Sequence, residues 1–143
     1  MEGREILLPV AVLVAWSLVM MVWMIVSRFA ALKAKGISLR GRVGGKPGML
    51  DGIVEDRAQW KAHNYIHLME QPTLFYAIAL SLALAGEGDG VNALLAWAYV
   101  GLRVVHSLIQ ATVNVILYRF VLFMLSSLAL AGLTIHALVS LIP

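Results

Sequence analysis

Two histidines and a carboxylate occur at helical spacing around the segment NYIHLMEQPTLFY, residues 64–76. His63, His67 and Glu70 follow one another at steps of four and three, so on a continuous helix they share one face, close to Asn64. Three kinds of site fit this pattern: an ion pair with a base on another helix, a metal or haem site ligated by imidazole, and a site for an organic ligand with charged ends. The spacing alone does not separate the last two.

A second polar face follows about forty residues later, at spacings of three, four and four: Arg103, His106, Gln110 and Asn114, with Arg119 shortly after. Guanidinium groups bind carboxylates through paired hydrogen bonds and repel metal cations. With Glu70 they therefore predict a site for a zwitterionic ligand that carries an amine and carboxylates, and no metal. The alternative is a closed Glu70–Arg103 ion pair with nothing bound.

The elements that carry these residues are predicted to be membrane helices. The chain has 143 residues, of which 61% are hydrophobic and only 13% charged, whereas soluble domains have about 25% charged residues. It has no cysteine, which excludes disulfides, thiolate metal ligands and a cysteine nucleophile. Lipid admits only helices or closed barrels, and the apolar runs lack the alternation of a barrel strand. We therefore expect an all-α integral membrane four-helix bundle.

The apolar runs predict one four-span domain over residues 1–143. Its helices are expected at about 6–27, 57–85, 91–114 and 117–141, with a loop at about 28–56. The first run is too long for a signal peptide. Pro72 lacks a backbone N–H and predicts a kink in the second helix.

The distribution of charge predicts the orientation. The loop at 28–56 is rich in Lys and Arg, the short third connection carries Arg119, and the second connection, GEGDG at 86–90, is acidic. Because basic loops stay in the cytoplasm, both termini and GEGDG are expected outside, and both polar faces in the cytoplasmic half. The net charge of +3 is modest, and we expect the lipid bilayer as a partner and no nucleic acid.

The two polar segments resemble one protein family. RAQWKAHNYIHLMEQPTLFYAIAL, residues 57–80, is similar to the segment of the MAPEG family (membrane-associated proteins in eicosanoid and glutathione metabolism) in which an Asn-x-x-Glu motif precedes proline and aromatic residues. AYVGLRVVHSLIQATVNVILYRF, residues 98–120, resembles the Arg-x-x-His run of bacterial members, which ends in arginine. The likeness is best over residues 57–120.

The resemblance implies a homotrimer of four-helix subunits in a bacterial inner membrane, with glutathione as cofactor between subunits and a hydrophobic small molecule as substrate. Glu70 matches the glutamate that holds the α-amino group, Arg103 a basic residue near the peptide's carboxylates, and Arg119 the arginine that stabilises the thiolate. His106 is an alternative proton acceptor. The remaining residues expected to bind the cofactor are Arg57, Lys61, His63, Asn64, His67 and Gln110.

Some positions depart from the family pattern. His67 stands where the family usually has Asn, although an imidazole can still donate or accept a hydrogen bond. His63 stands where several members have Arg. His106 and Gln110 occur where eukaryotic members have tyrosines, so the pattern does not choose between reactions.

The expected function is that of a glutathione-dependent transferase or peroxidase acting on apolar electrophiles. Two alternatives stay open. One is a haem- or metal-binding four-helix membrane protein, ligated by His63, His67 or His106. The other is a non-catalytic membrane scaffold whose polar faces only pair helices.

Overall fold

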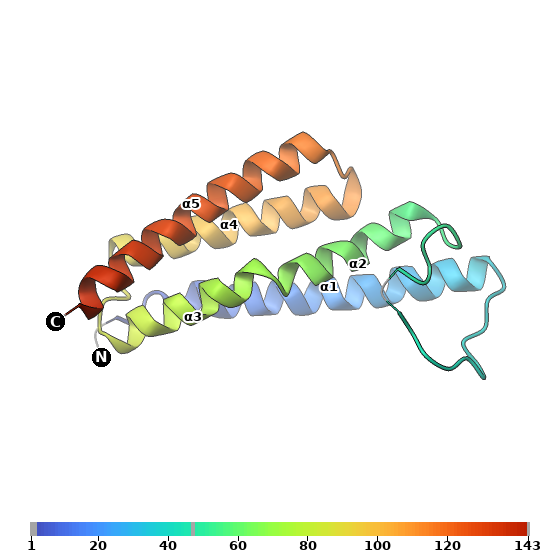
Figure 1. Ribbon diagram of the computed structural model, residues 1–143, viewed down its shortest axis with the longest axis horizontal. Coiled ribbons are helices and arrows are strands. Elements are labelled where there is room, and N and C mark those ends of the chain that lie inside the picture. The colour runs from blue at the N-terminus through green and yellow to red at the C-terminus, as the bar shows by residue number, and fades with distance from the viewer. Residues whose placement is uncertain (1–2, 47, 143) are drawn as a thin grey trace.

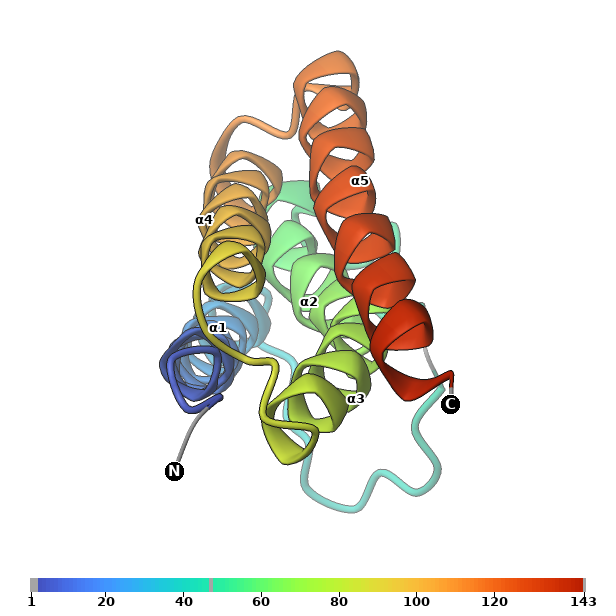
Figure 2. The same cartoon turned by 90° about the vertical axis from the view of Figure 1, so that its left-hand side faces the viewer.

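The protein forms a bundle of five α-helices in a computed structural model that describes residues 3–46 and 48–142. The helices are α1 (Leu7–Ala34), α2 (Asp56–Leu68), α3 (Gln71–Leu84), α4 (Val91–Thr112) and α5 (Ile116–Leu141). In Figure 1, α2 and α3 follow one another in the same direction beside α1, while α4 and α5 lie together above them. The end-on view in Figure 2 shows α1, α3, α4 and α5 around a common centre. The expected all-α architecture is confirmed.

Three of these helices are long and apolar enough to cross a membrane among the residues that the structure describes: α1, α4 and α5. A crossing helix needs about 20 residues, and α2 and α3 have only 13 and 14 each. The apolar core between the helices includes Leu13, Met20, Phe75, Tyr99 and Leu133.

Helix α1 continues seven residues beyond the expected end at residue 27. Length and hydropathy indicate where the hydrocarbon ends, but the chain stays helical until a residue that stops it. Gly36, at a φ of 65°, adopts the left-handed conformation. Its N–H bonds the carbonyl of Lys33, and the N–H of Ile37 bonds that of Leu32, each at 3.0 Å. This is the Schellman arrangement that ends many helices.

The segment expected as one helix over 57–85 is divided into α2 and α3, which end and begin on either side of Met69 and Glu70. Pro72 causes the division, because its ring displaces the carbonyl of Leu68 and it has no N–H to donate. The next residue fixes the start of α3: Thr73 donates to the carbonyl of Glu70 from its N–H at 3.2 Å and from Oγ1 at 2.7 Å. Glu70 therefore lies at the break and not on the helical face of His63 and His67.

The turn between α4 and α5 depends on Asn114. Its φ of 52° is left-handed, and its N–H donates to the carbonyl of Ile109 at 2.7 Å. Asparagine tolerates this conformation better than most residues. The tight turn ends α4 at Thr112, two residues before the expected end, and starts α5 at Ile116.

The residues before α1 are attached to the α3–α4 connection. The carboxylate of Asp89 accepts hydrogen bonds from the backbone N–H groups of Gly3 at 2.7 Å and Glu5 at 3.0 Å. The N–H of Ile6 donates to the carbonyl of Gly88 at 3.0 Å. We call this set of contacts the N-terminal clasp. It holds the start of α1 against the segment that leads into α4.

Candidate functional site

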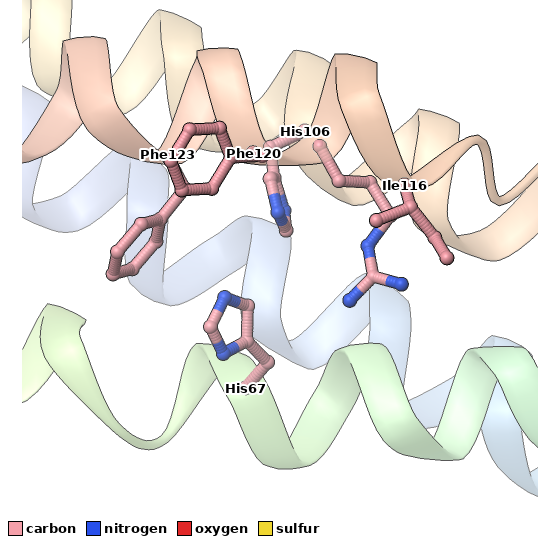
Figure 3. Close-up of a pocket in the computed structure, with 6 residues that line it drawn as sticks. His67, His106, Ile116, Phe120 and Phe123 are labelled. Carbon is pink, nitrogen blue, oxygen red and sulfur yellow. The ribbon is translucent and has the colours of Figure 1, made fainter.

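A pocket of about 250 Å³ opens between α2, α4 and α5. Its polar lining consists of His67, His106 and Arg119, and its apolar lining of Ile116, Phe120 and Phe123. Figure 3 shows His67 reaching from α2 toward His106 and Phe123. The pocket thus combines two imidazoles and a guanidinium with an apolar wall.

His67 is the centre of the polar contacts. Its Nδ1 lies 2.8 Å from Oε2 of Glu70, and because an ionised carboxylate only accepts, Nδ1 carries the proton of that bond. Its Nε2 lies 3.5 Å from Nη1 of Arg103. The ring lies 5.1 Å from that of His106 and 5.7 Å from that of Phe123, centroid to centroid. His67 therefore connects the carboxylate at the helix break with the cation on α4.

Arg103 is fully buried, with no exposed surface. Its Nη2 donates to the backbone carbonyl of His67 at 3.1 Å, and its guanidinium carbon lies 6.0 Å from the centre of the Phe123 ring. The structure does not have the closed Glu70–Arg103 pair: Glu70 bonds His67 instead, and its side chain is 61% exposed. Glu70 is thus available to a ligand, while Arg103 is bonded to the backbone of His67.

Arg119 is held at the pocket by the turn before it. Its Nη1 donates to Oδ1 of Asn114 at 2.7 Å. Asn114 therefore has two roles, because its backbone makes the left-handed turn and its side chain orients the arginine. The sequence placed Asn114 on the polar face of Arg103 but gave it no role.

Two other expected site residues lie inside the bundle and do not line the pocket. Asn64 is buried, and its Nδ2 donates to Oγ of Ser107 across the α2–α4 interface. Gln110 is also buried, on the same face of α4. Asn64 therefore joins α2 to α4, and Gln110 is enclosed in the bundle.

The remaining expected residues, Arg57, Lys61 and His63, lie on α2 away from the pocket. Lys61 donates from Nζ to the carbonyl of Arg57 at 2.7 Å and lies 5.7 Å from the centre of the Trp23 ring. His63 is half exposed and lies 3.9 Å from the carboxylate of Asp51. A single subunit does not bring these three side chains to Arg119.

The apolar wall was not anticipated from the sequence. Phe120 and Phe123 follow Arg119 at one and four positions, so one turn of α5 supplies both the guanidinium and the rings. Their spacing is the only available signal, and it does not differ from that of aromatic residues that face lipid. No group of three or more His, Asp or Glu side chains is placed to hold a metal ion within the described ranges.

The three long apolar helices define the class of protein, an α-helical integral membrane protein. The family model of the MAPEG family matches residues 6–139, and the chain belongs to this family. The resemblance in the two polar segments is thereby confirmed. No curated protein and no solved structure matches the chain significantly.

Proposed function

We propose that this protein is a glutathione-dependent transferase or peroxidase that acts on apolar electrophiles within the membrane. One observation carries the proposal: Arg119 and the aromatic rings of Phe120 and Phe123 line the same open pocket. A cation suited to a thiolate thus lies directly beside a surface suited to an apolar molecule. Family membership supports the proposal, since the family is associated with glutathione metabolism.

The charges at the pocket fit a zwitterionic peptide. Glu70 presents an exposed carboxylate, held by His67, to an amine. Arg119 presents a guanidinium. Both are anchored by neighbouring side chains, so little side-chain entropy is lost when a ligand binds.

The nucleophile would be the sulfur of glutathione, because the chain contains no cysteine. A guanidinium near a thiol lowers its pKa and raises the fraction present as the reactive thiolate. In our proposal Arg119 has this role, and His106, beside it in the pocket, accepts the proton. In conjugation, sulfur forms a bond to carbon as the leaving group departs. In peroxide reduction, sulfur forms a bond to oxygen as the O–O bond breaks, which gives a sulfenic acid and an alcohol. A second glutathione then displaces water to form a disulfide.

We further propose that α2 and α3 together make a fourth crossing. In Figure 1 they run end to end along α1, and the described chain begins and ends at the same end of the bundle, as an even number of crossings requires. The basic connection between α1 and α2 then lies in the cytoplasm of a bacterial cell. Both ends of the chain lie outside, and the site opens toward the cytoplasm.

The homotrimer is part of the same proposal. Arg57 and His63 are both exposed on α2 and do not line the pocket of their own subunit. In a trimer with glutathione between subunits, these exposed residues would face the neighbouring pocket. These residues would then complete a site that one subunit leaves partly open.

The test is a thermal-shift titration of the purified protein with glutathione, together with the ultraviolet absorbance of the thiolate. Ligands that bind only the folded state raise the melting temperature. We expect Glu70→Gln to weaken binding about tenfold, since one charge-assisted hydrogen bond is lost. Arg119→Ala is expected to abolish the thiolate signal while the fold stays intact.

Matched controls are Glu55→Gln and Arg40→Ala, which remove the same charges from exposed positions away from the pocket. Both should behave like the wild-type protein. A wild-type protein that shows no shift with glutathione would favour the scaffold alternative. A Soret band or bound metal in the purified protein would favour the haem or metal alternative.

A further inference from the structure

Two apolar grooves lie at the end of α1 that leads into the basic connection. One, of about 280 Å³, includes Met24, Ile25 and Arg28 in its lining. The other, of about 350 Å³, includes Lys33 and the backbone turn at residues 36–38. They share one wall made of Phe29, Leu32 and Leu39. Both lie along the last three turns of α1, one on each side of this wall, and we call the two together the α1 groove.

The α1 groove lies where hydrocarbon gives way to headgroups. The uncharged run from Ile6 to Ser27 has 22 residues and is about 33 Å long as a helix, which matches a hydrocarbon layer about 30 Å thick. Arg28 is the first charged residue after this run and therefore falls at the level of the phosphates. Met24 and Ile25 lie on the hydrocarbon side of Arg28, and Lys33 lies on the aqueous side.

The α1 groove is positively charged. Between Arg28 and Leu50 the sequence contains six Lys and Arg residues and no Asp or Glu. Among the described residues, the buried Nε of Arg28 has no hydrogen-bond partner. A guanidinium in this state is suited to a phosphodiester, which offers two oxygens to its paired N–H groups.

The connection is folded back over the groove in a defined way. The N–H of Ile37 bonds the carbonyl of Leu32 at 3.0 Å, and Nε of Arg42 bonds the carbonyl of Ser38 at 3.0 Å. These bonds place Leu39 beside Phe29, where it contributes to both grooves. The wall between the grooves thus depends on local hydrogen bonds as well as on apolar contact.

From this arrangement we propose that the α1 groove is a binding site for one anionic phospholipid. Its phosphate is bound by Arg28 and Lys33, and its acyl chain lies along Met24 and Ile25. An occupant at this depth must be apolar on one side of Arg28 and anionic at its level, which is the chemistry of a phospholipid and not of a soluble peptide. This site is separate from the pocket of Arg119, and the inference does not depend on glutathione.

The test compares lipids in a titration of the delipidated protein, followed by native mass spectrometry. The probes are phosphatidylglycerol and phosphatidylcholine with identical acyl chains. We expect phosphatidylglycerol to bind at least about tenfold more tightly, because its headgroup has a net negative charge and that of phosphatidylcholine has none. The double variant R28Q/K33Q should lose this preference.

The matched control is R40Q/K46Q, which removes two charges from the same connection at positions that do not line the α1 groove. It should keep the preference, and so should R28K/K33R, which retains both charges. Leu39→Ala should weaken binding of both lipids by removing part of the shared wall. An equal loss in R28Q/K33Q and R40Q/K46Q would overturn the site, because attraction would then be diffuse. Equal affinity for the two lipids would overturn it as well.

Discussion

Arg103 on α4 donates a hydrogen bond from Nη2 to the backbone carbonyl of His67 on α2, over 3.1 Å. In an unbroken helix this carbonyl would accept from the N–H of Gln71, but the chain is interrupted between Leu68 and Gln71. The N–H of Glu70 reaches it only at 3.4 Å. A side chain from another helix thus satisfies a carbonyl that the interruption releases, as a bundle in lipid requires. The break and the site are therefore one structural unit.

Replacing Pro72 with Ala should weaken this unit. Without the proline ring, α2 and α3 can join, and the N–H of Gln71 then competes with Arg103 for the carbonyl of His67. We expect glutathione affinity to fall about tenfold, which corresponds to roughly 1.4 kcal/mol. Helix content by circular dichroism should not fall. The control is Pro9→Ala, in the first turn of α1, which should leave glutathione affinity unchanged. Unchanged affinity in P72A as well would show that the break does not shape the site.

Two substitutions at Asn114 should separate its two roles. Asn114→Gly keeps the left-handed turn but removes the acceptor of Arg119, so we expect normal stability with a reduced thiolate signal. Asn114→Ala removes the acceptor and also strains the turn, at a cost of about 1–2 kcal/mol. Chemical denaturation and thiolate absorbance measure the two effects. Identical behaviour of the two variants would contradict this division.

A methyl group at Gly88 should disrupt the N-terminal clasp. A Cβ at this position would overlap the carbonyl oxygen of Gly3, which is backbone and cannot rotate away. We expect Gly88→Ala to lower the free energy of unfolding by about 1–3 kcal/mol, as overpacking commonly does. The control is Gly101→Ala in α4, where a Cβ meets nothing within 4 Å. Denaturant titration should show no loss of stability for that variant.

The N-terminal clasp should also be sensitive to acid. Hydrogen bonds from the backbone N–H groups of Glu5 and Gly3 lower the pKa of Asp89 below its usual value near 3.8. A carboxylate with a depressed pKa in the folded state stabilises the fold above its ordinary pKa, and this contribution is lost as pH falls through the depressed value. The melting temperature should therefore fall as the pH is lowered from the ordinary value near 3.8 to below the depressed pKa of Asp89, and by less in Asp89→Asn. Parallel curves for the two proteins would show that Asp89 does not contribute.

The sequence predicted which polar residues lie near one another better than it predicted how the helix break orients them. The spacing of Arg103 and His106 on one helix, and the position of His67 on another, correctly indicated two polar faces that contact each other. Ionisable groups inside a membrane protein need polar partners, and the other polar face supplies them. Pro72 indicated an interruption. The spacing could not show that the break turns Glu70 away from the face of His63, since periodicity assumes a continuous helix.

Other features had no local signal. Phe120 and Phe123 line the pocket, but an aromatic residue on a membrane helix packs against lipid, protein or substrate with the same pattern. The N-terminal clasp joins Gly3 to Asp89, which are 86 residues apart, and neither sequence neighbourhood specifies the other. The additional turns of α1 were not predicted, because hydropathy indicates which residues can lie in the hydrocarbon layer and not where the helix ends.

That separation of 86 residues between Gly3 and Asp89 has a consequence for biosynthesis. At a synthesis rate of roughly 5–20 residues per second, Asp89 leaves the ribosome several seconds after Gly3. During this interval the residues before α1 lack the carboxylate of Asp89 as a hydrogen-bond acceptor. Closure of these contacts therefore marks the moment at which α3 has been completed and the chain has returned to the end of the bundle where it began.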